Sequence, residues 1–147
     1  VHGKHTARVV AFDKLNDIAV LRIFGATASR PLPLVDPQPG ASVAIVGYPE
    51  NGLLHLTPGR VGLTEEALTE DAYGNGPVTR EITTLAGVVR HGDSGAPAID
   101  ASGAVEATVF AARVGKSGGY AVPASVVRRV LASARAASVS TGNCASG

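Results

Sequence analysis

Short apolar runs separated by glycine- and proline-rich turns are the feature of this 147-residue chain that most constrains its fold. Eighteen glycines and nine prolines supply the turns. Runs this short suit strands better than the helices of a bundle, so the pattern predicts a small antiparallel barrel. The predicted strands of this barrel cover residues 42–48, 53–63, 78–85, 95–99, 105–112 and 119–122.

Two further strands and a helix flank the predicted barrel. Residues 4–12 and 17–23 read as strands joined by a turn at residues 13–16. Four prolines then predict an extended linker, because proline fixes φ and removes a ladder donor. Apolar residues at helical spacing follow Pro123, a residue suited to a helix start. The predicted division is a first-barrel remnant over 1–30, a linker over 31–40, a second barrel over 41–122, a helix over 123–137 and a tail over 138–147.

Charge and composition exclude several function classes. Thirteen Lys and Arg against twelve Asp and Glu leave a net charge of +1. This balance provides no strong positive electrostatic potential that would attract nucleic acid. No run of eighteen apolar residues occurs, which argues against a membrane span within this stretch. The chain begins with valine and lacks methionine, so we expect a fragment or processed product whose natural start lies upstream. We expect neither a metal nor a cofactor.

The strongest chemical signal is the hexapeptide Gly92-Asp93-Ser94-Gly95-Ala96-Pro97. Glycines on both sides of a serine permit a tight turn that points Oγ outward. Such a turn also leaves the N–H groups of Gly92 and Ser94 free to converge as an oxyanion hole. An ordinary glycine–serine turn is the alternative interpretation of these residues.

A second signal is Asp17 at the mouth of the apolar run Ile18-Ala19-Val20-Leu21. An acid held at the start of a buried strand is well placed to orient an imidazole. Taken alone, this pattern favours the simpler interpretation, an aspartate that caps a hairpin turn.

Together the two motifs resemble the trypsin-like serine protease superfamily, in which a histidine, an aspartate and a serine follow in that order. Residues 44–49, 105–112 and 119–123 agree with strands of that family. Details at 71–74, at 78–81 and at Cys144 are similar to the membrane-anchored acid-resistance serine proteases of actinobacteria. The resemblance implies an all-β, chymotrypsin-like double β-barrel with a C-terminal helix, its first barrel incomplete here. It also implies that Ser94 is the nucleophile and that Asp17 orients the histidine.

The same resemblance implies further features of the site. A peptide or protein substrate would enter a pocket between Val88, Val89, Arg90 and His91 on one side and Val109, Phe110, Ala111 and Ala112 on the other. No acid stands out at the base of this pocket, which favours a neutral substrate side chain. An extracytoplasmic location, an upstream membrane anchor and a disulfide from Cys144 to an upstream cysteine are also implied; from the residue alone, a free thiol is an equal alternative.

The chain departs from the family pattern in two places. Ala96 replaces the usual second glycine, and its methyl group is expected to narrow the active-site wall. The stretch that carries the catalytic histidine is absent. With a turn at 13–16, Phe12 faces Asp17, and His5 lies seven residues down the ladder, roughly 23 Å away at ~3.3 Å per residue.

The other histidines are no better placed. His2 is further from Asp17 than His5 is, and His55 is expected on the surface or the barrel wall. His91, three residues before Ser94, is interpreted as a rim residue of the pocket, with a surrogate base as the less favoured alternative.

These observations predict a serine endopeptidase domain. This chain alone is expected to be inactive, because the catalytic histidine is missing. Unclosed strand edges of the first barrel are expected to invite association. The alternative is a peptide-binding or regulatory module that keeps the groove on the same fold and has lost catalysis.

Overall fold

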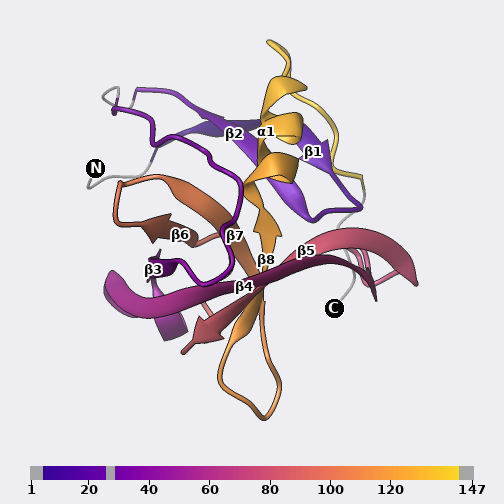
Figure 1. Cartoon of the computed structure of the whole chain (residues 1–147). Coiled ribbons are helices and arrows are strands. Elements are labelled where there is room, and N and C mark those ends of the chain that lie inside the picture. The colour runs from indigo at the N-terminus through magenta and orange to yellow at the C-terminus, as the bar shows by residue number, and fades with distance from the viewer. Residues whose placement is uncertain (1–4, 26–28, 143–147) are drawn as a thin grey trace.

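The computed structural model describes residues 5–25 and 29–142 and is mostly β, with one α-helix near the C-terminus. A two-stranded antiparallel sheet comes first, formed by β1 (Ala7–Asp13) and β2 (Ile18–Ile23). It lies beside the helix α1 (Ala124–Ala132), on one side of a closed barrel (Figure 1). The predicted all-β architecture with a C-terminal helix is confirmed. The barrel strands are β3 (Ser42–Gly47), β4 (His55–Thr69), β5 (Val78–Gly87), β6 (Pro97–Asp100), β7 (Val105–Ala112) and β8 (Gly119–Pro123), with a 3₁₀ turn η1 (Pro49–Asn51) after β3.

The barrel closes in the order β3-β4-β5-β8-β7-β6, with β6 pairing back onto β3. Alternate residues of each strand face inward, which is why the sequence shows apolar residues at every second position. Four alanines belong to the core, and their small side chains let the strands close tightly. The core consists of Val43, Ile45, Val61, Leu85, Ala96, Ala98, Ala107, Val109 and Ala121.

Strand β4 is longer than the predicted 53–63 segment and continues to Thr69. A register shift between Val61 and Thr64 marks the passage from pairing mainly with β3 to pairing with β5 alone. Glu65 and Glu66 made this part look unlike a strand. Both are exposed and lie opposite Ile82 and Glu81 of β5. Polar residues on a solvated face do not interrupt a strand, so the polarity of this stretch misled the prediction.

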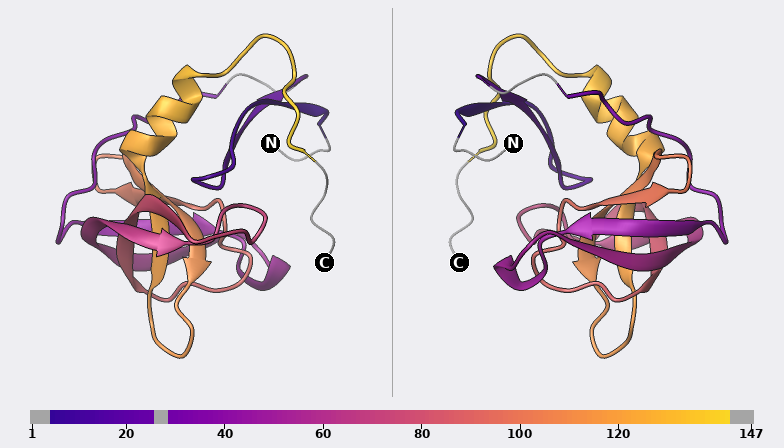
Figure 2. Two further views of the ribbon diagram at one scale, coloured as in Figure 1. Left: turned by 90° about the vertical axis from the view of Figure 1, so that its right-hand side faces the viewer. Right: turned by 90° about the vertical axis from the view of Figure 1, so that its left-hand side faces the viewer.

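The helix is shorter than the predicted 123–137 segment: Pro123 is its N-cap and Ser133 its C-cap. The chain then runs along β1, where the N–H groups of Arg135 and Val139 donate to the carbonyls of Val10 and Val9, both at 2.9 Å. Figure 2 shows this segment crossing the β1–β2 ribbon. The free edge of β1 thus offers the backbone partners that further helical turns would otherwise supply. One of the strand edges predicted to be open is therefore partly covered.

The proline-rich linker is extended, as predicted, but it is also bound to the barrel. Leu34 forms a parallel bridge with Val105, and the N–H of Val35 donates to the Val105 carbonyl at 3.0 Å. The carboxylate of Glu106, only 2% exposed, accepts the N–H of Gln38 at 2.7 Å. The linker therefore has a fixed path along β7.

A second apolar cluster attaches the ribbon to the rest of the molecule. Ala11 and Ile18 of the ribbon pack with Val122 of β8 and with Val126 and Val130 of α1. No helix among the described residues is long and apolar enough to cross a membrane. His2 and Cys144 lie outside the described residues.

Candidate active site

The turn that carries Ser94 depends on its two glycines. Gly92 has φ 93° and Gly95 has φ 85°, a region that residues with a side chain rarely adopt. A Cβ on Gly92 would also lie 2.4 Å from the Tyr48 carbonyl oxygen. The exposed side chain of Ser94 therefore projects from a turn that only this glycine pattern permits.

A buried carboxylate supports the turn from inside. Asp93 is 2% exposed, and its Oδ2 accepts the N–H of Arg90 at 2.9 Å. Gly47 makes room for it, since a Cβ there would lie 2.5 Å from Asp93 Oδ1. Among the described residues, neither the Gly92 nor the Ser94 amide donates to a backbone carbonyl outside the strands. Both groups remain available to a ligand, although their oxyanion role stays a prediction.

Asp17 is the last residue of the β1–β2 turn, with φ 57°. The expectation that Phe12 faces Asp17 is wrong. The last pair of the ladder is Asp13 with Ile18, one residue later in each strand than expected. The cause is the Asp13 side chain, which accepts the N–H of Asn16 at 3.1 Å and its Nδ2 at 2.6 Å. This local hydrogen bonding starts the turn one residue later than predicted.

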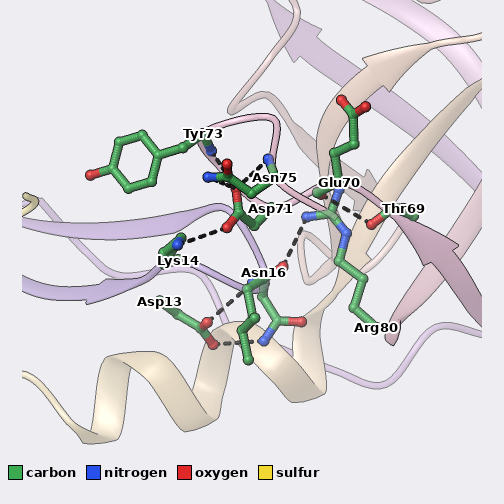
Figure 3. Close-up of polar contacts among 10 residues, drawn as sticks. Asp13, Lys14, Asn16, Thr69, Glu70, Asp71, Tyr73, Asn75 and Arg80 are labelled. Atoms are coloured by element: carbon green, nitrogen blue, oxygen red, sulfur yellow. Dashed lines mark hydrogen bonds and ion pairs between the residues drawn. The ribbon is translucent and has the colours of Figure 1, made fainter. Parts of the chain in front are cut away.

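The barrel holds the Asp17 turn through several polar contacts (Figure 3). Lys14 Nζ lies 2.9 Å from Asp71 Oδ2, and the Lys14 carbonyl accepts the N–H of Ala72 at 3.0 Å. Arg80 Nη1 donates to the Leu15 carbonyl at 3.5 Å. The turn of the first sheet is thus fixed by residues of the second barrel.

Asp71 is the centre of this contact. Its Oδ1 accepts the N–H groups of Tyr73 at 2.8 Å and Asn75 at 3.0 Å, while Oδ2 faces Lys14. The Lys14 hydrogen bond and these backbone donors lower the pKa of Asp71 to about 2, against a smaller opposing effect of burial. The carboxylate therefore stays ionised in acid that protonates most aspartates.

Asp17 and Ser94 line one cavity of about 400 Å³, although they come from different sheets. Ser94 Oγ lies 3.4 Å from the Phe110 carbonyl oxygen, and Phe110 lines the same cavity. The structure thus brings together the two residues that the sequence predicted as catalytic. The remaining lining residues are Ile18, Ala19, Gly95, Thr108 and Val109.

A second cavity, of about 590 Å³, also begins at Ser94. Six of the eight predicted pocket residues line it, whereas Val88 and Val109 do not. Val109 belongs to the barrel core at 2% exposure. Glu50, Arg113 and Val114 also line the cavity but were not predicted, because they lie outside the two predicted walls. The cavity is lined by Glu50, Val89, Arg90, His91, Ser94, Phe110, Ala111, Ala112, Arg113 and Val114.

No described histidine lines the cavity that Asp17 and Ser94 share. His91 lines the other cavity, where Asp17 is absent, as the rim interpretation expects. His5 precedes Thr6, whose carbonyl accepts the N–H of Phe24 at 2.9 Å, at the end of the ribbon opposite Asp17. His55 is exposed at the start of β4, in agreement with its prediction as a surface residue.

Comparison with known proteins identifies the family. A family model of the trypsin-like peptidase domain matches residues 2–107. The chain belongs to the trypsin-like serine proteases. It is 37% identical to serine protease Rv3671c of Mycobacterium tuberculosis, over 95% of this chain and 36% of that protein. It is 33% identical to the chloroplastic Protease Do-like 1 of Arabidopsis thaliana, over 85% of this chain and 30% of that protein.

Solved structures agree on the fold of this protease domain. The active form of Rv3671c superposes with a TM-score of 0.87 at 34% identity, covering 97% of this chain and 64% of that one. Its inactive form gives 0.75 at 34% identity, covering 90% of this chain and 68% of that one. The chain spans about a third of the length of the curated M. tuberculosis relative, 36%.

Proposed function

We propose that this chain forms most of the active site of a serine endopeptidase, with Ser94 as nucleophile and Asp17 as the carboxylate that orients a histidine. The observation that carries the proposal is the cavity of about 400 Å³ that both side chains line. A water molecule takes about 30 Å³ of liquid, so this cavity has room for an imidazole ring between them. We propose that an imidazole in this cavity bonds Ser94 Oγ on one side and the Asp17 carboxylate on the other.

The chemistry follows from this geometry. The imidazole takes the proton of Ser94 Oγ while Oγ attacks the carbonyl carbon of the scissile peptide bond. The N–H groups of Gly92 and Ser94 hold the oxygen that becomes negatively charged, a contribution of ~10²–10³ in rate for each donor. The imidazolium returns its proton to the leaving amine, and water then hydrolyses the acyl-enzyme.

Similarity to the active form supports a competent arrangement of these residues. The TM-score is 0.87 against the active form of Rv3671c and 0.75 against its inactive form. The family relatives are proteases by name, which supports peptides or proteins as the substrates here. The apolar residues that line part of the larger cavity agree with a short substrate side chain at that position.

The second candidate is a peptide-binding module without catalysis. The described histidines favour it, because none of them lines the cavity shared by Asp17 and Ser94. We propose that the histidine comes from outside residues 1–147, and that the chain alone therefore does not turn over substrate.

Labelling by a fluorophosphonate probe tests the proposal. The longest protein that the gene encodes should be labelled at Ser94, and its Ser94→Ala variant should not be labelled. Ser102→Ala is the matched control, because Ser102 is an exposed turn serine that bonds only Asp100. Labelling of the parent at another residue contradicts the nucleophile assignment. An unlabelled parent that still binds peptides supports the module.

We further propose an extracytoplasmic location, an upstream membrane anchor and a disulfide between Cys144 and an upstream cysteine. The family resemblance supports all three, and a bridge closing so large a loop is typically worth ~2–4 kcal/mol. Thiol titration of the denatured, unreduced protein decides the disulfide: a fully reactive Cys144 excludes it.

A further inference from the structure

We infer that the cavity beginning at Ser94 and running along Phe110–Val114 selects peptides that carry an acidic side chain. This rests on the proposed function only in taking the bound peptide as a substrate. Binding itself requires no catalysis. Three features carry the inference. Part of the cavity lining is apolar, the charged part has two arginines against one glutamate, and an aromatic stack holds one of these arginines, Arg113.

Part of the cavity lining is apolar, and it is called the floor below. Val89 packs directly on Gly119, where a Cβ would lie 2.8 Å from Val89 Cγ2. Ala111 and Ala112 complete the apolar surface. A short aliphatic stem can contact these apolar residues, and a polar end of the substrate side chain can contact the charged residues of the same lining.

Among the residues that line the cavity, two are arginines, Arg90 and Arg113, and one is a glutamate, Glu50; these charged residues are called the rim below. None of the ion pairs between described residues includes any of these three. His91 lines the same cavity. The rim is therefore positive and its guanidinium groups are unpaired, which favours a carboxylate over an amide or an ammonium in the ligand.

Arg113 lies between this cavity and a neighbouring one that Tyr120 and Phe110 also line, and an aromatic stack holds it there. Its guanidinium carbon lies 5.4 Å from the centroid of the Tyr120 ring, and its Nε donates to Tyr120 Oη at 3.4 Å. Tyr120 stacks on Phe110 with centroids 6.4 Å apart, and Phe110 in turn packs under the buried Arg80. Among the described residues the Nη atoms of Arg113 make no hydrogen bond or ion pair, so they can bind a carboxylate, and the stack reduces the entropy lost on binding.

Arg90 and Glu50 are also fixed through their backbones. The N–H of Arg90 donates to the buried Asp93 carboxylate at 2.9 Å, and the N–H of Glu50 donates to the His91 carbonyl at 2.6 Å. The backbones of Arg90 and Glu50 are therefore held by different hydrogen bonds. The Glu50 carboxylate repels an acidic ligand. Removing its charge should therefore change the peptide preference in the direction opposite to removing an arginine.

Fluorescence anisotropy on this chain measures the preference directly. The probes are short labelled polyalanine peptides with one aspartate, asparagine or lysine, placed at each position in turn. At the best position we expect aspartate to bind about three- to tenfold more tightly than asparagine, as two exposed charge pairs allow. The difference should shrink as salt is added, because exposed charges are screened.

Variants assign the effect to the rim. Arg113→Gln and Arg90→Gln should each reduce the aspartate preference, whereas Glu50→Gln should increase it. Arg60→Gln is the matched control, because Arg60 lines neither cavity at Ser94 and donates to the Gly40 carbonyl instead. Thermal unfolding of each variant confirms that it is folded.

Three results overturn the inference: equal affinity for aspartate and asparagine at every position, no binding of any peptide, or an aspartate preference unchanged in both arginine variants. Fluorophosphonate labelling of Ser94 is scored separately. Labelling without an acidic preference rejects the inference and keeps the proposed function. An acidic preference without labelling keeps the inference and favours the binding module.

Discussion

The guanidinium carbon of Arg80 lies 4.2 Å from the centroid of the Phe110 ring, on the far side of the stack that ends at Arg113. Arg80 is 7% exposed and also donates to the Leu15 carbonyl in the Asp17 turn. Burial lowers the pKa of Arg80, and the carboxylates of Asp17 and Asp13 act in the opposite direction. Since an arginine stays protonated in proteins, one buried cation links the Asp17 turn to the strand beside Ser94.

Replacing this cation should loosen the turn. We expect Arg80→Gln to lower the free energy of unfolding by about 1–2 kcal/mol, because it removes a buried cation–π contact and a hydrogen bond. Amide exchange in the turn at residues 14–17 should rise more than exchange in the barrel strands. Urea unfolding and hydrogen exchange measure the two effects.

Arg129→Gln is the control for Arg80. Arg129 of α1 makes an exposed ion pair with Glu81 at 3.4 Å. Glu81 lies on β5, the same strand as Arg80. Exposed pairs contribute about 0–1 kcal/mol, so its loss should leave turn exchange unchanged. Uniformly faster exchange in Arg80→Gln, in the barrel as much as in the turn, contradicts a specific hold on the Asp17 turn.

The Lys14–Asp71 contact predicts how stability depends on pH. The folded-state pKa of Asp71 is about 2, below the ordinary value of 3.8. A depressed pKa means that the stabilisation is fully present above the ordinary value and is lost as pH falls toward 2. Asp71→Asn should therefore destabilise the protein at neutral pH, and its difference from the parent should shrink below about pH 4.

Lys14→Met separates the ion pair from the backbone donors. It should raise the pKa of Asp71 toward its ordinary value, because the Lys14 hydrogen bond is the largest cause of the shift. Urea unfolding from pH 6 down to about pH 2 measures both variants. An Asp71→Asn deficit that stays constant over this range would show that Asp71 acts only through its shape.

The sequence predicts the strands whose two faces differ in polarity. Strand β7 has the predicted bounds, Val105–Ala112, because its apolar run is bounded by turns on both sides. Ser94 and Asp17 could be singled out because their neighbours are unusual: glycines on both sides of a serine, and an acid at the mouth of an apolar run. Local patterns of this kind carry their own physical reason.

The features that the sequence could not predict depend on distant partners. Arg80 acts through Phe110 and Leu15, and no local pattern marks that contact. Residues 133–137 continue the predicted helix in sequence, yet the N–H groups of Arg135 and Val139 donate to β1, whose edge is free only in this fold. The one-residue shift at Asp17 comes from a side-chain hydrogen bond of Asp13. Tertiary contacts override local preference in each case.

Ala96 is placed differently from the sequence expectation. Its side chain is 5% exposed and belongs to the barrel core, 3.1 Å from the position a Cβ on Gly47 would occupy. It lines neither cavity at Ser94, so the expected narrowing of the active-site wall is not found. The substitution is accommodated by the core instead.

Ala96→Gly should therefore affect stability and not ligand binding. We expect a loss of about 1–2 kcal/mol, from one buried methyl group and the greater backbone freedom of glycine. Peptide affinity, measured by anisotropy, should be unchanged. A peptide affinity that rises in Ala96→Gly would show that the methyl group does restrict the pocket.

Added imidazole should activate this chain at Ser94. The cavity lined by Asp17 and Ser94 has a volume of about 400 Å³ and contains no described histidine side chain. A free imidazole that enters it can take the Ser94 proton while Asp17 orients the ring. Proton transfer by a positioned base contributes ~10²–10⁴ in rate, and a mobile base recovers part of that. We expect ester hydrolysis to rise about tenfold at saturating imidazole.

Two variants decide whether the gain arises in this cavity. Ser94→Ala should abolish it, and Asp17→Asn should reduce it, because the orienting carboxylate is lost while the cavity keeps its shape. His91→Ala should leave it intact, since His91 lines the neighbouring cavity. The gain should saturate with imidazole concentration, as binding to a defined site requires, whereas attack by imidazole in solution rises linearly. A linear gain that persists in Ser94→Ala would place the reaction outside the protein.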